Sequence, residues 1–278
     1  MIIAFLISFC ACIAGAICGM GGGVIIKPVL DFIQFGSTST ISFMSGCTVL
    51  AMTTYSVGKS LKSGEKTVEM KTVTPLAIGA AIGGVLGKSL FNTVRDMFAN
   101  RQMVGAVQSL ALAVITIATL VYTLKKDKIK TKNITSAAGC FVIGLCLGVV
   151  SSFLGIGGGP INLVVLYYFF SMQTKVAAAN SLYIILFSQA ASVISTFVTG
   201  IPAFELPKLL TMMAGGVCGG IVGRKLSKKM DNKAVDKLFI LMMCFIIAIS
   251  FYNAYVYASS SLILPQRTKD SFFTYIGF

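Results

Sequence analysis

Residues 19–23 read GMGGG, and residues 155–159 read GIGGG, 136 positions further along the chain. Each glycine run lies inside a long apolar stretch, residues 2–30 and 137–170. Consecutive glycines break a helix and leave backbone groups unpaired, which is tolerated at membrane depth only inside protein or beside water. Residues 2–35 are also too many for a single membrane crossing, because a continuous helix of that length would be roughly 50 Å long and the hydrocarbon core of a bilayer is about 30 Å thick. The pattern predicts a hairpin of two short helices at each run.

The offset between the two glycine runs holds along the following sequence without a gap. About 22 of the first 90 positions are identical to their partners, and the glycines at 79, 83, 84 and 87 match those at 215, 219, 220 and 223. Shared apolar composition would not keep glycines in register. The sequence therefore predicts two related halves, residues 1–132 and 133–278, each a Gly-broken helical hairpin followed by three transmembrane helices. The four-residue spacing of the later glycines indicates a helix-contact stripe.

The composition is that of an all-α polytopic membrane protein. Of the 278 residues, 56% are hydrophobic and only 12% are charged, whereas soluble domains carry about 25% charged residues. Apolar runs long enough to cross a bilayer recur along the whole chain. The net charge of +14 lies in the short connections between these runs, so we expect contact with the lipid bilayer and no nucleic-acid partner.

The distribution of Lys and Arg predicts how the halves are oriented. If each hairpin returns to its own side, each half crosses an odd number of times and the second half is inverted. That arrangement puts 16 Lys and Arg on one side and 6 on the other, whereas parallel halves with single-crossing first segments give 10 and 12. Only inversion obeys the positive-inside rule. We therefore expect an inverted repeat in a bacterial inner membrane, with residues 125–132 in the cytoplasm and both termini outside.

Several classes of chemistry are disfavoured. The chain has no histidine, and its eight cysteines lie within apolar runs without a C-x-x-C pair, so neither a catalytic triad nor a metal site is expected. Neither Gly-Lys-Ser triplet, at 58–60 or 87–89, follows the glycine that a phosphate-binding loop requires, and the glycine runs do not fit G-x-G-x-x-G. We expect no enzyme activity and no cofactor, and the sequence does not indicate an oligomeric state.

The two glycine runs are the strongest candidates for a substrate site. Helix N-termini that follow such breaks present free N–H groups and positive dipole ends, the arrangement that holds substrates in inverted-repeat transporters. The alternative is that the glycines only permit close helix packing. The predicted site residues from the runs are Gly19, Gly21, Gly22, Gly23, Gly155, Gly157, Gly158 and Gly159.

Polar side chains near the runs complete the predicted site. Lys27 is the one basic residue well inside an apolar segment, and an intramembrane charge indicates a functional site. It could hold an anionic substrate, or it could form an i, i+4 ion pair with Asp31. Ser45, Asn180 and Ser181 lie in the next span of each half. They could bind the oxygens of an anion, or they could form hydrogen bonds between helices.

Taken together, these motifs resemble the sulfite exporter TauE/SafE family. The resemblance rests on the paired G-x-G-G-G runs, the prolines at 28 and 160, the pairs Met44-Ser45 and Asn180-Ser181, and the G-x-x-x-G-G-x-x-G stripes. It implies an inner-membrane exporter of sulfite, sulfonates or related small organic anions, by uniport or secondary transport. An anion channel and a non-transporting membrane scaffold or assembly subunit are the alternatives. Because Pro28 lies five residues after its run and Pro160 directly follows its own, a strictly symmetric site is not expected.

Overall fold

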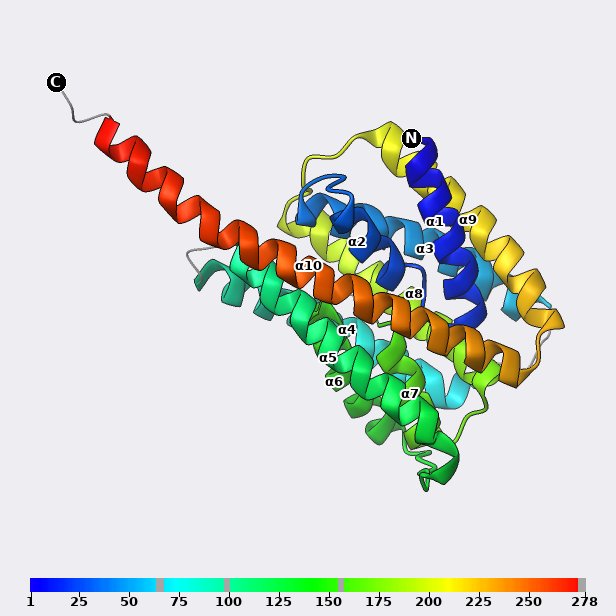
Figure 1. The fold of residues 1–278 in the computed structure, drawn as a ribbon. Helices are drawn as coiled ribbons and strands as arrows, with labels where there is room; N and C mark the ends of the chain where they lie inside the picture. Colours follow the sequence, from blue (N-terminus) through cyan, green and yellow to red (C-terminus); the bar gives the residue numbers. More distant parts are fainter. Residues whose placement is uncertain (64–67, 98–100, 155–157, 275–278) are drawn as a thin grey trace.

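The computed structural model describes residues 1–63, 68–97, 101–154 and 158–274, and this part of the chain is all-α (Figure 1). The α-helical fold predicted from composition is therefore confirmed. The helices are α1 (Ile2–Cys18), α2 (Gly23–Phe32), α3 (Thr38–Lys62), α4 (Met70–Met97), α5 (Arg101–Lys125), α6 (Ala137–Phe153), α7 (Pro160–Phe170), α8 (Thr174–Thr199), α9 (Leu206–Lys229) and α10 (Asn232–Thr274), with a 3-10 turn, η1 (Lys126–Lys128), after α5.

Both halves of the chain contain two short helices followed by three long ones, as predicted. Helices α3 and α8 begin at residues 38 and 174, and α4 and α9 begin at residues 70 and 206, so the helix starts keep the offset of the glycine runs. The division of the chain at residue 132 stays a prediction.

The long helices are built to cross a membrane. Five of those described, α4, α5, α8, α9 and α10, are long and apolar enough to do so. Helix α3 is equally long but carries ten Ser and Thr residues and is not among the five. Helices α1 and α6 have 17 residues each, or about 26 Å, less than the roughly 30 Å of the hydrocarbon core. The chain is a multi-pass membrane protein in which the short helices form the hairpins.

The later glycine stripes bring helices from different halves into backbone contact. A Cβ added at Gly83 of α4 would overlap the carbonyl of Leu145 in α6, and one added at Gly219 of α9 would overlap the carbonyl of Phe9 in α1. In both pairs the residue numbers of the touching positions rise together, so the two helices run parallel. These glycines therefore serve close helix packing.

Each hairpin returns to the side from which it entered. Helix α1 runs alongside α9, and Gly22 then lies against Cys12, so the chain turns back after α1. The loop that follows α2 reaches the start of α9, where the ammonium group of Lys208 lies over the ring of Phe35. In the second half, the N–H of Lys132 donates to the carbonyl of Tyr168 at 2.7 Å, which ties the end of α7 to the segment that precedes α6.

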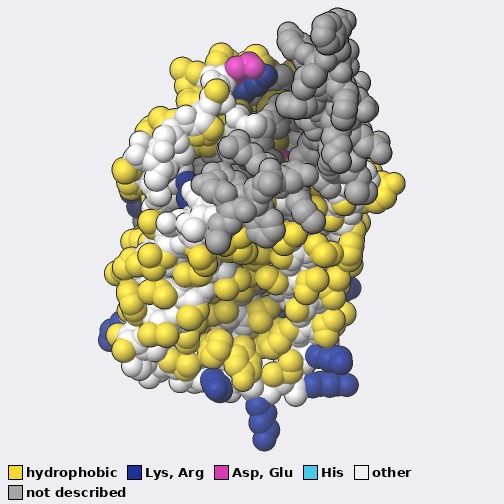
Figure 2. Space-filling view, turned by 90° about the vertical axis from the view of Figure 1, so that its left-hand side faces the viewer, with side chains coloured by type: hydrophobic (Ala, Val, Ile, Leu, Met, Phe, Trp, Pro, Cys, Tyr) yellow, Lys and Arg dark blue, Asp and Glu magenta, His cyan; other side chains and the backbone are white. Residues whose placement is uncertain are grey.

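The molecule consequently has two distinct ends. At the first, which we call the open end, the loops 33–37 and 200–205 meet; Thr40 Oγ1 donates to the carbonyl of Ala203 at 2.9 Å. At the second, the closed end, the connections 126–136, 171–173 and 230–231 meet; Ser171 Oγ donates to the carbonyl of Lys132 at 2.9 Å. Figure 2 shows a broad hydrophobic band between the ends, with several Lys and Arg side chains at the lower border and a polar, hollowed region above. This band matches the surface that lipid would cover.

Candidate functional site

A cavity of about 1050 Å³ lies between the two halves of the chain. Helices α2, α3, α4, α5, α6, α8 and α10 all contribute residues to its wall. Its rim includes Gly36 and Ser37 of one open-end loop and Ile201 and Pro202 of the other. None of the described residues from the closed-end connections lines it. The cavity is therefore reached from the open end.

The glycine runs form breaks because their backbone conformations favour glycine. Helix α1 ends at Cys18 and is capped by Gly19, whose φ of 74° is left-handed, and Gly21 follows with a φ of 62°. In the second half, Gly159 has a φ of 57°, and Pro160 then starts α7 at a position where its missing N–H is not needed. Side chains with a Cβ are disfavoured at these φ values, so each run fixes where its hairpin turns.

The two breaks meet at the cavity wall. A Cβ added at Gly159 would overlap the side chain of Val24, and Gly21 and Gly158 both lie beside Ile185 of α8. Gly23 and Gly158 line the cavity itself. Of the other predicted site glycines, Gly19, Gly21, Gly22 and Gly159 are described but do not line the cavity, whereas Gly155 and Gly157 lie outside the described residues.

Lys27 lies in the cavity wall and is only 8% exposed. Its Nζ donates to Gln108 Oε1 of α5 at 3.3 Å, and Gln108 Nε2 in turn donates to the carbonyl of Phe153 at 3.2 Å. Asp31, one turn further along α2, also lines the cavity. Among the contacts of the described residues, no ion pair within 4.0 Å joins Asp31 to Lys27. The ammonium group thus faces the cavity while it donates to a neutral amide.

The structure adds a second lysine to the wall that the sequence did not single out. Lys88 of α4 donates to the carbonyl of Ser192 at 3.3 Å and to Thr196 Oγ1, both on α8. It stands at the end of an apolar run, so in the sequence it looked like a loop cation. With Lys27, Lys88 and Asp31 as the charged residues of the described wall, the cavity carries a net charge of +1. Such a cavity favours an anion.

A polar stripe on α8 faces the same cavity. Ser188, Ser192 and Thr196 follow one another at intervals of four residues, and Gln189 precedes Ser192 by three, which puts all four side chains on one side of the helix. Gln189 lies beside Gly46 of α3, one residue from the predicted site residue Ser45. Ser45 also lines the cavity, next to Gly23. The wall thus offers hydroxyl and amide groups close to the first glycine break.

Asn180 and Ser181 are buried on α8 but are not part of the cavity wall. Ser181 Oγ donates to the carbonyl of Gly19 at 2.6 Å. Asn180 Oδ1 accepts from the N–H of Glu69 at 2.9 Å, and its Nδ2 donates to the carbonyl of Val176 at 2.8 Å. These bonds satisfy backbone groups, and a role in substrate binding stays a prediction for both residues.

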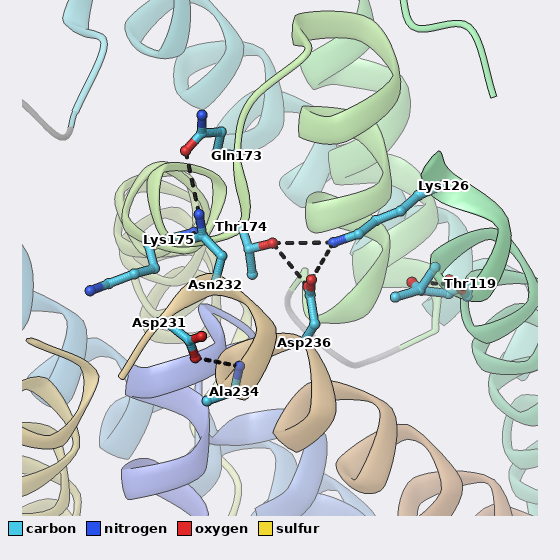
Figure 3. Close-up of polar contacts among 10 residues, drawn as sticks. Thr119, Lys126, Gln173, Thr174, Lys175, Asp231, Asn232, Ala234 and Asp236 are labelled. Carbon is cyan, nitrogen blue, oxygen red and sulfur yellow. Dashed lines mark hydrogen bonds and ion pairs between the residues drawn. The ribbon is translucent and has the colours of Figure 1, made fainter. Parts of the chain in front are cut away.

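A polar cluster holds the closed end together. Lys126 Nζ pairs with Asp236 Oδ2 at 2.6 Å, and Thr174 Oγ1 donates to Asp236 Oδ1 at 2.9 Å. Figure 3 shows the three side chains pointing toward one another from different elements. The ammonium group of Lys126 also lies 4.8 Å from the ring centre of Tyr167. The cluster joins η1, the start of α8 and the start of α10 on the side away from the cavity mouth.

Comparison with known proteins places the chain among membrane transporters. The model of the family described as sulfite exporter TauE/SafE matches residues 4–250. The chain is similar to the probable membrane transporter protein YunE of Bacillus subtilis, with 24% identity over 250 residues that cover 84% of this chain and 90% of that protein. It is also similar to the probable membrane transporter protein MamO of Magnetospirillum gryphiswaldense, with 24% identity over 86% of this chain, although the match spans only 43% of MamO. No solved structure matches the chain.

Proposed function

Because the chain belongs to the sulfite exporter TauE/SafE family of membrane transporters, we propose that it carries a small anion across the membrane through the cavity between its halves. The proposal rests on one observation: Lys27, Lys88 and a glycine from each of the two breaks line the same cavity. The substrate is a sulfite, a sulfonate or a related organic anion. Of the residues predicted for the site, Lys27, Ser45, Gly23 and Gly158 line the cavity, and we infer that they contact the substrate.

The shape of the cavity favours a carrier over the two alternatives. A channel requires a continuous pore, but among the described residues the closed-end connections contribute nothing to this wall. A scaffold subunit needs no charged central cavity. A site that opens at one end and is closed at the other by the cluster around Asp236 fits alternating access.

Two equivalent contacts support the inverted repeat. Lys88 donates to the carbonyl of Ser192, and Arg224 Nη1 donates to the carbonyl of Ser56 at 2.6 Å. The two donors, and likewise the two acceptors, are related by the same offset as the glycine runs. Lys88 lies on the wall of the cavity that opens at the open end, whereas Arg224 also reaches Ser63 beyond the last residue of α3. An inverted repeat predicts that two equivalent contacts lie toward opposite sides of the membrane.

The charge distribution orients the protein in its membrane. The closed end carries the loop at 125–132 and most other Lys and Arg residues, so it faces the cytoplasm of a bacterial cell by the positive-inside rule. The cavity then opens outward. A potential of 100 mV, negative inside, favours the exit of a monovalent anion by about 2.3 kcal/mol, or roughly 1.7 decades of concentration. An anion uniporter in this orientation is an exporter.

The orientation can be tested with single cysteines in a Cys-free background. The two variants are Lys128→Cys, at the closed end, and Ser37→Cys, at the open end. Both positions are exposed. With intact cells and a membrane-impermeant thiol reagent, we expect labelling at position 37 and none at position 128 until the cells are opened. Labelling of position 128 from outside would contradict the inverted arrangement.

The proposed function itself can be tested with purified protein. A ligand that binds the native state raises its apparent stability, so the melting temperature should rise with at least one of sulfite, thiosulfate, sulfoacetate, isethionate or a short carboxylate. The same anion should leave loaded proteoliposomes faster than it leaves protein-free liposomes when the potential is negative inside. If no anion shifts the melting temperature or moves across the liposome membrane, the proposal is wrong.

A further inference from the structure

Two buried polar side chains flank the second glycine break without a hydrogen-bond partner. Asn162, in the first turn of α7, is fully buried, and neither its Nδ2 nor its Oδ1 has a partner. Ser151, near the end of α6, is 3% exposed; its Oγ lacks a partner and the residue lines the cavity. Between them in the sequence lies Gly158, which lines the cavity. Asn162 itself does not line the cavity. Its Nδ2 would lie 2.7 Å from a Cβ added at Gly158, so the amide lies directly behind this glycine.

Unpaired buried polar groups lower the stability of the folded protein. A buried donor or acceptor without a partner destabilises a protein by about 1–3 kcal/mol, and native structures contain few of them. Four other described residues, Ser8, Tyr122, Tyr167 and Ser250, also have such an atom. Among the described residues, Asn162 is the one with two buried side-chain polar atoms that both lack a partner.

The first half turns at its own glycine run without polar side chains at the two equivalent positions. At the offset that relates the two halves, Ser151 corresponds to Gly15 and Asn162 corresponds to Ile26. Gly15 faces Gly22 directly, and Ile26 is fully buried. The first hairpin therefore forms with a hydrogen atom and an aliphatic side chain at these positions. The hydroxyl of Ser151 and the amide of Asn162 have no polar counterpart there.

We propose that Asn162 and Ser151 are specificity-determining residues of the transport site, which donate hydrogen bonds to the oxygens of the bound anion at the second glycine break. The inference rests on the proposed function, and it adds donors from the second half of the chain to Lys27 from the first. The amide of Asn162 offers two N–H donors and the hydroxyl of Ser151 offers one. An anion with two or more acceptor oxygens, such as a sulfonate, a sulfite or a carboxylate, can use both.

The surroundings favour an anion over a cation at this place. Asn162 is in the first turn of α7, an 11-residue helix, where the helix dipole is positive. The charged side chains of the described cavity wall add a net charge of +1. A metal cation would need several oxygen ligands and compensating negative charge, whereas the single carboxylate of the described wall, Asp31, comes from the other half.

The test replaces each polar group by an apolar one of similar size and measures binding and stability separately. Asn162→Leu and Ser151→Ala are purified, and sulfite, thiosulfate, sulfoacetate, isethionate and acetate are titrated against the melting temperature. We expect each variant to melt at or above the temperature of the wild type without anion, because an unsatisfied group has been removed. The affinity for the anion that the wild type binds should fall roughly tenfold or more.

A matched control is Asn253, a buried asparagine that lines the cavity. Its Nδ2 donates to the carbonyl of Pro28 at 3.1 Å, so Asn253→Leu should lower the melting temperature. If Asn162→Leu lowers it in the same way, or leaves the affinity unchanged, the inference is wrong while the proposed function stands. If the wild type binds none of the five anions, the proposed function fails and the inference fails with it.

Discussion

The variant Lys27→Met is expected to lose most of its anion transport while remaining folded. A hydrogen bond to a charged group contributes about 1.5–3 kcal/mol, so the affinity for the anion should fall by roughly ten- to one-hundred-fold. Removal of a buried ammonium group also removes its desolvation cost. The melting temperature without anion should therefore stay near that of the wild type or rise. Flux from proteoliposomes and thermal unfolding in detergent measure the two effects independently.

Asp31 supplies the matched control for this prediction. If Lys27 served mainly as an ion-pair partner, Lys27→Met would strand the carboxylate of Asp31 and lower the melting temperature, and the double variant with Asp31→Asn would restore it with transport intact. The structure favours the other outcome, because Lys27 Nζ contacts Gln108 Oε1 at 3.3 Å and the described contacts include no ion pair within 4.0 Å to Asp31. Unchanged flux in the single variant would remove Lys27 from the site.

The second large effect is expected from Gly19→Ala, which should destabilise the first hairpin. Gly19 has a φ of 74°, and an added Cβ would overlap the backbone of Ala178 in α8. The left-handed conformation costs a residue with a Cβ roughly 1–2 kcal/mol, and overpacking adds about 1–3 kcal/mol. The carbonyl of Gly19 would also shift from Ser181 Oγ, which donates to it at 2.6 Å. We expect a melting temperature lower by several degrees and weaker anion binding.

Gly58→Ala is the matched control for the glycine prediction. Gly58 lies inside α3, and an added Cβ there meets nothing within 4 Å. Alanine is favoured over glycine in a helix interior by about 0.5–1 kcal/mol, so this variant should melt at or slightly above the temperature of the wild type. Equal melting temperatures for Gly19→Ala and Gly58→Ala would show that the first break tolerates a side chain, contrary to the packing described above.

Much of the site followed from the sequence because glycine runs and membrane charges are rare signals. The runs at 19–23 and 155–159 predicted two breaks, and Gly23 and Gly158 do line the cavity together with Lys27 and Ser45. The inverted relation of the halves and the role of these residues in binding stay predictions. Asn180 and Ser181 had the same polar character as Ser45, yet their side chains bond to backbone groups away from the wall.

The all-α membrane fold, the order of short and long helices and the positions of the two turns could be predicted from the sequence. Apolar runs, their lengths and the glycines between them specify these features locally. The face of each helix that meets the cavity depends on how the helices pack and could not be predicted in this way. This packing turned Lys88 of α4 toward α8, and it left Ser151 and Asn162 unpaired at the second break. Lipid and the interior of the protein are both apolar, so a membrane helix shows little contrast in sequence between its outer and inner faces. The side that a polar residue faces is then set by how the helices pack.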